Sequence, residues 1–278
     1  MDRRHSGRSH AELRETLRST AHNCEQLRNK NSRVHVFDRR AACSRLINLR
    51  TLFTEPLPAR LSHFQPLLDA SPGLREALLR VTTIAQALLV VPRETDDLSG
   101  AAPLILVNTH LFFHGNAPHI RNMHVAALLA EAAAIAENLP EGSERPPVIF
   151  CGDLNSDLND GVPGVVAMLQ NGRLPADYWD WAYGADFDFG QGKQRPHSAP
   201  ASDDGTDAAP PPHDTSGPVN TKGIAVTGVD VELPCRFVSS HDLETQRMTN
   251  VVPQFEGVLD YIWLQAERLQ VRSLAADE

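Results

Sequence analysis

Cysteine is scarce in this 278-residue sequence, and its spacing matches neither a zinc site nor a disulfide framework. The four cysteines, Cys24, Cys43, Cys151 and Cys235, are scattered, without a Cys-x-x-Cys pair. Structural zinc sites and disulfide-rich secreted scaffolds both need clustered or regularly spaced cysteines. We therefore predict a protein of a reducing, intracellular compartment, either the cytoplasm or the mitochondrion.

The sequence also lacks any apolar run of the roughly 20 residues that a membrane-spanning helix needs, so we expect no membrane partner. The first ten residues, MDRRHSGRSH, are rich in Arg and Ser but contain no apolar stretch. This composition argues against a secretory signal. A mitochondrial transit peptide is compatible with it, although Asp2, Glu12 and Glu15 count against that interpretation.

An excess of positive charge is missing too. The chain has 26 Lys and Arg against 35 Asp and Glu, a formal net charge of −9. A protein that bound nucleic acid through a broad basic surface would usually be positive. We therefore expect any nucleic acid to bind locally, at a site with a metal and a few Arg or His side chains. An acidic balance suits a domain that holds Mg²⁺ with carboxylates. No protein partner can be inferred.

The chain does contain apolar strands interleaved with helices, which predicts an α/β domain. Residues 1–33 are polar and predict a tail or loose helix, and residues 34–278 form the expected domain. Residues 190–222 are rich in Gly, Pro, Ser and Asp, which predicts a disordered insertion. Helical patterns cover 55–83, 119–138 and 161–171, and shorter strands are expected at 45–54 and 85–91. Continuous apolar runs at 103–108, 147–151 and 258–264 predict strands buried on both faces.

Polar groups accompany each of these three apolar runs. Asn108-Thr109-His110 follows the first run, Gly152-Asp153-Leu154-Asn155-Ser156 follows the second, and Asp260 lies inside the third. Each motif alone has a simpler interpretation, as a turn, a helix cap or a locally paired Asp. All three together, at the carboxyl ends of neighbouring strands, predict one shared crevice.

The residue types in these motifs suit the hydrolysis of a phosphodiester, which needs an activated water, a metal and donors for the phosphate oxygens. Asp153 could accept the proton of the attacking water. Asn155, two residues further along an extended chain, could orient that water or donate to the phosphate. His110 could donate to a phosphate oxygen, and Asp260 could orient another histidine, as a carboxylate does in a catalytic triad.

The order NTHL (108–111), GDLNS (152–156) and LDYIW (259–263) resembles the endonuclease/exonuclease/phosphatase superfamily, on its deadenylase-type branch. The Ile-Arg at 120–121, the segment 172–181 and the stretch 249–261 look closest to the 2′,5′-phosphodiesterase group. The resemblance implies a two-sheet α/β sandwich, Mg²⁺ held in part by Asp153, and an RNA or oligoadenylate substrate. It also implies catalytic roles for His110, Asp153, Asn155 and Asp260. Substrate-binding roles are implied for Asn108, Arg121 and Phe255, although Phe255 could equally be a core aromatic.

The chain departs from the family pattern in two places. The family's first half supplies a Gln-Glu strand whose Glu is the chief Mg²⁺ ligand, and a Ser-Asp-His segment follows the last motif. Neither is found here, and no histidine follows His241. We therefore expect a partial sandwich: a truncated copy, a partial gene model or a degenerate copy, with little or no activity by itself.

Two other functions compete with the partial enzyme. A catalytically dead relative that acts as a binding or interaction module is the main alternative. An unrelated α/β hydrolase is disfavoured, because the sequence has no Gly-x-Ser-x-Gly nucleophile motif.

Overall fold

A computed structural model describes residues 41–90, 102–139, 143–160, 162–184, 187, 228–253 and 255–271 of the chain. The tail predicted at 1–33 and the insertion predicted at about 190–222 lie outside these residues, so both stay predictions. No helix in the described ranges is long and apolar enough to cross a bilayer.

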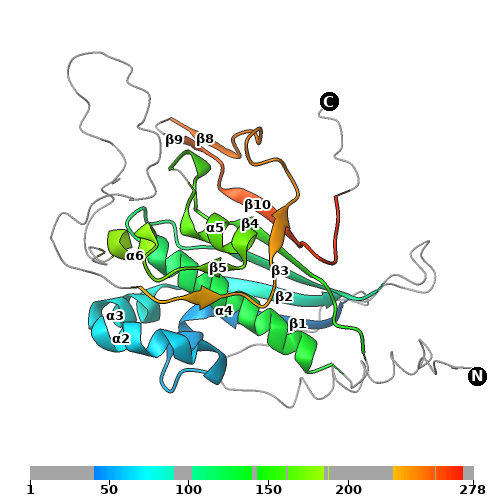
Figure 1. Cartoon of the computed structure of the whole chain (residues 1–278), viewed down its shortest axis with the longest axis horizontal. Coiled ribbons are helices and arrows are strands. Elements are labelled where there is room, and N and C mark those ends of the chain that lie inside the picture. Colours follow the sequence, from blue (N-terminus) through cyan, green and yellow to red (C-terminus); the bar gives the residue numbers. More distant parts are fainter. Residues whose placement is uncertain are drawn as a thin grey trace, which may run out of the picture.

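A six-stranded sheet forms the centre of the molecule (Figure 1). Its strands, in spatial order, are β1 (Ala41–Asn48), β2 (Ile84–Val90), β3 (Leu104–His110), β4 (Val148–Asp153), β10 (Asp260–Gln265) and β7 (Phe237–Ser239). Only β3 and β4 run parallel, and every other neighbouring pair is antiparallel. The predicted α/β class is confirmed.

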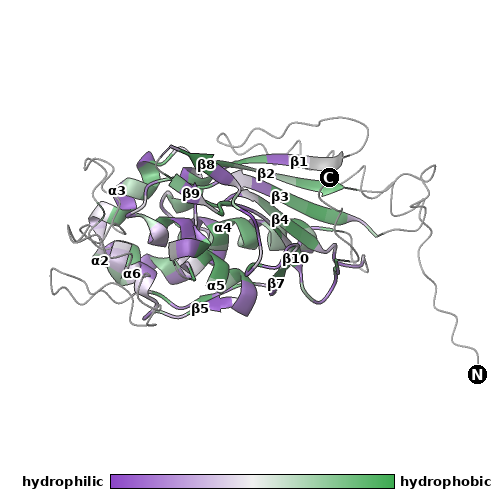
Figure 2. Ribbon diagram, turned by 90° about the horizontal axis from the view of Figure 1, so that it is seen from above, coloured by the Kyte–Doolittle hydropathy of each residue, from purple (hydrophilic) through white to green (hydrophobic). Residues whose placement is uncertain are grey.

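Helices cover one face of this sheet, as the view from above shows (Figure 2). The longest helix, α4 (Pro118–Glu137), follows β3 and connects it to β4 by the crossover that a parallel pair requires. The shorter helical segments are η1 (Leu49–Phe53), η2 (Ala59–Phe64), α2 (Gln65–Ala70), α3 (Pro72–Arg80), η3 (Leu158–Asp160), α5 (Gly164–Asn171) and α6 (Trp179–Gly184).

Two small two-stranded sheets complete the described structure. One pairs β5 (Arg173–Leu174) with β6 (Val231–Glu232), and the other pairs β8 (Asn250–Val252) with β9 (Phe255–Gly257). The helix predicted at 161–171 corresponds to α5, and it ends where Gly172 adopts a left-handed conformation with φ 74°. Glycine is favoured at that position because a side chain would strain the backbone.

The strand predicted at 45–54 is wrong in its second half. β1 ends at Asn48, and Leu49–Phe53 forms a 3₁₀ helix instead. Leu49, Leu52 and Phe53 are all buried. Their spacing of three and four residues places them on one side of a helical turn, so the turn buries all three against the core, which a strand could not do.

The prediction that the apolar runs are buried on both faces is also wrong for the described residues. In β3, Ile105 and Val107 are fully buried against the helical layer, while Leu104 and Leu106 on the opposite face are only partly buried. β2, β4 and β10 show the same alternation. Helices cover only one face, and the outer face carries the site described below.

Candidate functional site

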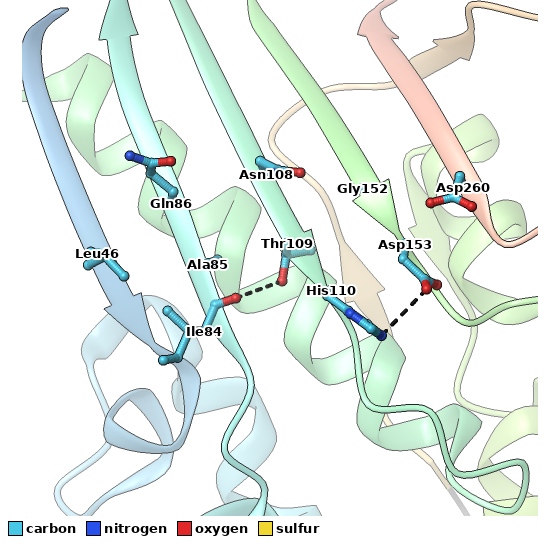
Figure 3. Close-up of a pocket in the computed structure, with 10 residues that line it drawn as sticks. All are labelled: Leu46, Ile84, Ala85, Gln86, Asn108, Thr109, His110, Gly152, Asp153 and Asp260. Atoms are coloured by element: carbon cyan, nitrogen blue, oxygen red, sulfur yellow. Dashed lines mark hydrogen bonds and ion pairs between the residues drawn. The ribbon is translucent and has the colours of Figure 1, made fainter. Parts of the chain in front are cut away.

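The strand registers bring His110, Asp153 and Asp260 into one row across the sheet. His110 of β3 pairs with Asp153 of the parallel strand β4, and Asp153 pairs with Asp260 of the antiparallel strand β10. Nε2 of His110 lies 3.4 Å from Oδ2 of Asp153 (Figure 3). Three residues that are far apart in the sequence therefore meet at one edge of the outer face.

Asp260 reaches this edge in a different way from the other two. β3 and β4 both end there, as expected for parallel neighbours, whereas β10 runs in the opposite direction and begins there with Asp260. The prediction that all three polar groups stand at carboxyl ends of strands is therefore wrong for Asp260. Thr249 fixes this start, because its Oγ1 accepts hydrogen bonds from the backbone N–H groups of Leu259 and Asp260.

The row opens into a pocket of about 460 Å³ on the outer face. Asn108 lies one row inward from His110, and its Oδ1 lies 3.8 Å from Sγ of Cys151. The pocket is lined by Leu46, Ile84, Ala85, Gln86, Asn108, Thr109, His110, Gly152, Asp153 and Asp260 (Figure 3). The pocket is thus polar and acidic on the β3–β4–β10 side and mainly apolar on the β1–β2 side.

The β1–β2 side of the pocket was not predicted from the sequence. Its lining includes Leu46, Ile84 and Gln86. Gln86 pairs across the sheet with Leu46 and Asn108, and Ile84 precedes the pair of Ala85 with Thr109. A signal was present, because the alternation in the segment from Ile84 to Val90 places Ile84 and Gln86 on one face. However, the alternation does not reveal that β1 and β3 flank β2, so it could not place these residues beside Asn108 and His110.

The carboxyl group of Asp153 is held partly out of water. Burial raises its pKa above the ordinary value for an Asp. The backbone N–H of Asn155 donates to Oδ1 at 2.9 Å and lowers the pKa, as does nearby His110, whereas the charge of Asp260 raises it. A carboxylate with a raised pKa is a stronger base than one in open solvent.

Asn155 ties the end of β4 to the loop that follows β3. Its Nδ2 donates to the carbonyl oxygen of Leu111 at 2.8 Å, and the N–H of Leu111 donates to the carbonyl of Asp153 at 2.8 Å. We had expected an extended chain here, but Asn155 has a φ of 47° and the chain turns. Asn tolerates this left-handed conformation better than most residues. Its side chain therefore contacts the loop rather than lining the pocket.

The other two predicted substrate-binding residues stand outside the pocket. Arg121 is only 6% exposed, in the first turns of α4, and its Nη1 donates to the carbonyls of Phe112 and His114. Phe255 begins β9 and is partly buried. A Cβ at Gly257 would lie within 3 Å of the Phe255 ring and of the Asp157 carboxylate, so the three are tightly packed. Asn108 is the predicted binding residue that lines the pocket.

No protein-family model matches the chain, but several curated sequences do. It is 33% identical to 2′,5′-phosphodiesterase 12 of Rattus norvegicus over 132 residues, which make up 47% of this chain and 20% of that protein. It is 35% identical to human protein angel homolog 1 over 104 residues, 37% of this chain and 15% of that protein. The match thus spans a fifth or less of each of these relatives.

The predicted resemblance to the endonuclease/exonuclease/phosphatase superfamily is confirmed. A solved structure also resembles this chain. The crystal structure of ANGEL2, described as a 2′,3′-cyclic phosphatase, has a TM-score of 0.47 and 18% identity, and covers 86% of this chain and 56% of that one.

The superfamily implies a divalent metal, and the donors in the row partly fit one. Asp153 and Asp260 stand directly opposite each other on neighbouring strands and supply hard oxygen ligands beside the pocket. Mg²⁺ is usually held by one or two carboxylates together with waters and substrate phosphates. Within the described ranges, no group of three or more His, Cys, Asp or Glu side chains is arranged to hold a metal. The row therefore supplies two carboxylates toward such an ion, fewer ligands than a closed metal site has.

Proposed function

We propose that this chain carries the site of an Mg²⁺-dependent phosphodiesterase, an exoribonuclease acting on oligoadenylate or poly(A) RNA. The observation that supports this most directly is the row of His110, Asp153 and Asp260 at one edge of the sheet, beside a pocket of about 460 Å³. Pockets of this size suit a small ligand such as a nucleotide. The names of relatives whose sequences match, 2′,5′-phosphodiesterase 12 among them, support the same class of reaction.

In the proposed reaction, water attacks the phosphorus and the bond to the leaving ribose oxygen breaks. Asp153 accepts the proton that the water loses, because its carboxylate lines the pocket beside His110. His110, 3.4 Å from Asp153, donates to a phosphate oxygen, and Asn108 can donate to the same group from the next row. The leaving oxygen takes a proton from solvent. When bound, Mg²⁺ supplies the positive charge that stabilises the transition state.

Asn155 and Arg121 act as positioning residues in this proposal. Asn155 fixes the carbonyl of Leu111, directly after His110, and Arg121 fixes two further carbonyls of the same loop. Asp260 faces Asp153 across the strand pair and would hold the metal together with it. The same two carboxylates would repel each other without a cation, which favours metal binding at this point.

The test is hydrolysis of 2′,5′- and 3′,5′-linked oligoadenylate by the purified chain, followed by chromatography of the released 5′-nucleotides. Because the chain lacks two of the family's motifs, we expect little cleavage even at high protein concentration in millimolar MgCl₂, none in EDTA, and none in Asp153→Asn. The Asn variant keeps the shape of the side chain and removes its charge and basicity.

A matched control is Asp230→Asn, which changes an acidic side chain outside the lining of the pocket. It should cleave at the wild-type rate. Cleavage that survives Asp153→Asn, or that needs no divalent metal, would refute the proposed function. Binding of oligoadenylate without any turnover would favour a catalytically dead binding module instead.

A further inference from the structure

The loop after the site, residues 111–117, presents an aromatic side chain to solvent. Phe113 is 56% exposed, which is unusual for a Phe, and it follows His110 by three residues. Three residues of extended chain span at most about 10 Å. The backbone of Phe113 therefore lies no more than about 10 Å from that of His110, in the row where the phosphate is proposed to bind.

The backbone on both sides of Phe113 is fixed by one buried side chain. Nη1 of Arg121 donates to the carbonyl of Phe112 at 3.2 Å and to the carbonyl of His114 at 2.8 Å. Arg121 itself is held in α4 and is 6% exposed. Hydrogen bonds from a charged donor are stronger than neutral ones, so the loop is held in one conformation. The exposure of Phe113 thus belongs to an ordered loop.

Aromatic contacts also hold this loop in place. The Phe112 ring meets Phe113 at 5.5 Å with an interplanar angle of 61°, and it meets Phe187 at 5.9 Å and 81°. His114 packs against Phe187 at 5.0 Å and stacks with Phe112 at 6.1 Å. Edge-to-face and offset contacts of this kind are favourable and hold rings in place.

From this geometry we propose that Phe113 is a stacking platform for a nucleobase of the substrate. The inference rests on the proposed function, because it assigns the nucleotide that neighbours the phosphate at His110 and Asp153. A flat, exposed ring on a fixed loop near a phosphate site is what base stacking needs, and stacking tolerates every base because each has a π-face. Phe113 would thus add affinity for nucleic acid that the acidic surface of the chain does not supply.

The test compares two fluorescein-labelled strands by fluorescence anisotropy with the full chain in MgCl₂. One is hexa-adenylate, and the other is an abasic strand with the same number of phosphates; both carry phosphorothioate linkages that resist hydrolysis. We expect Phe113→Ala to weaken binding of hexa-adenylate by about 5- to 150-fold, the range for one stacked base. Binding of the abasic strand should not change, and Phe113→Trp should bind hexa-adenylate at least as well as wild type.

Two controls separate stacking from folding. Val251→Ala removes another exposed apolar side chain, 64% exposed on the β8–β9 hairpin, and should leave both affinities unchanged. Phe113→Leu keeps an apolar side chain in the loop and should lose as much affinity for hexa-adenylate as Phe113→Ala. Equal affinity of Phe113→Ala and wild type for hexa-adenylate, or equal losses for the two strands, would overturn the platform.

The anisotropy experiment measures binding and does not depend on hydrolysis. It can therefore refute the stacking role of Phe113 without refuting the proposed function, and the reverse. One possible result is that Phe113→Ala loses affinity for hexa-adenylate only, while no hydrolysis is lost in Asp153→Asn. This result would support the stacking role and refute the hydrolase. Hydrolysis that is lost in Asp153→Asn, together with equal affinities of wild type and Phe113→Ala for hexa-adenylate, would support the hydrolase and refute the stacking role.

Discussion

Gly152 on β4 passes so close to Thr109 on β3 that no side chain fits between the two strands. A Cβ added to Gly152 would lie 1.9 Å from the carbonyl oxygen of Thr109, and Gly152 has a φ of 134°. We expect Gly152→Ala to lower the free energy of unfolding by roughly 3 kcal/mol or more, because it combines a backbone clash with a strained conformation. Urea unfolding followed by circular dichroism measures the loss.

Gly73→Ala is the matched control for this substitution. Gly73 lies in α3, and an added Cβ would meet nothing within 4 Å. Alanine is favoured over glycine in a helix, so the control should be neutral or stabilising by about 0.5–1 kcal/mol. Similar unfolding free energies for the two variants would show that β3 and β4 can move apart to admit a side chain.

Glu131 is a carboxylate with no exposed surface, and it joins α4 to two other segments. It accepts a hydrogen bond from Nη1 of Arg45 on β1 at 2.7 Å, and it also pairs with Arg60 of η2. We expect Glu131→Ala to cost about 2 kcal/mol in unfolding free energy, since both arginines are about a third exposed and can turn toward water. Glu76→Ala, which breaks the exposed pair with Arg80, should change stability by about 0.3 kcal/mol. Equal effects of the two changes would contradict the structural role of Glu131.

The sequence predicted the strands and the polar row because each element carries its own local signal. Apolar runs that end in Asn, His, Gly and Asp mark both β3 and β4. The direction of β10 has no local signal, and this is why Asp260 was placed at the wrong end of its strand. The burial of both faces was wrong for a similar reason: an apolar run does not say whether a second layer covers it.

The partners of Arg121 also depend on more than the local sequence. The resemblance implies that it binds substrate, and in the structure it is buried and donates to the loop carbonyls. Its position in the first turns of α4 was predictable, but its partners depend on the conformation of the loop before the helix. Glu131 carries a signal that went unused. An acid in the middle of an Ala- and Leu-rich stretch of helix is a sign of a buried ion pair, because an isolated buried charge is too costly to keep.

Asp180 of α6 is fully buried and accepts hydrogen bonds from Nδ2 of Asn122 at 2.7 Å and from the N–H of Gly164 at 3.0 Å. Burial raises its pKa to about 6, although Asn122, Arg121 and Gly164 lower it in part. The folded state therefore binds more protons than the unfolded state between about pH 4 and 6, so this group's contribution to stability falls as the pH rises through that window.

Asp180→Asn keeps the acceptor and removes the titration. We expect the unfolding free energy of the variant, relative to wild type, to rise by roughly 3 kcal/mol between pH 4 and pH 7. Urea unfolding at each pH measures this difference. A difference that stays constant across the range would mean that Asp180 remains charged in the folded protein.

His124 has the opposite dependence on pH. It lies in the core beside Phe53, with ring centroids 5.9 Å apart, and burial followed by the charge of Arg121 lowers its pKa to about 3. An unfolded histidine has a pKa of about 6.5, so the unfolded state binds more protons between pH 3 and 6.5. Stability must then fall as the pH drops through this window, by about 1.4 kcal/mol per pH unit for this one group.

His124→Phe fills the same space and has no proton to gain, so it should resist acid better than wild type. At pH 8 the two proteins differ only in packing, and this measurement is the reference for the comparison. Between pH 6.5 and pH 4.5 we expect the variant to gain about 2–3 kcal/mol relative to that reference, measured by urea unfolding. His119, whose pKa burial also lowers to about 3, remains in the variant, so acid sensitivity should be reduced but not abolished. A variant that loses stability in parallel with wild type would show that His124 reaches water when it is protonated.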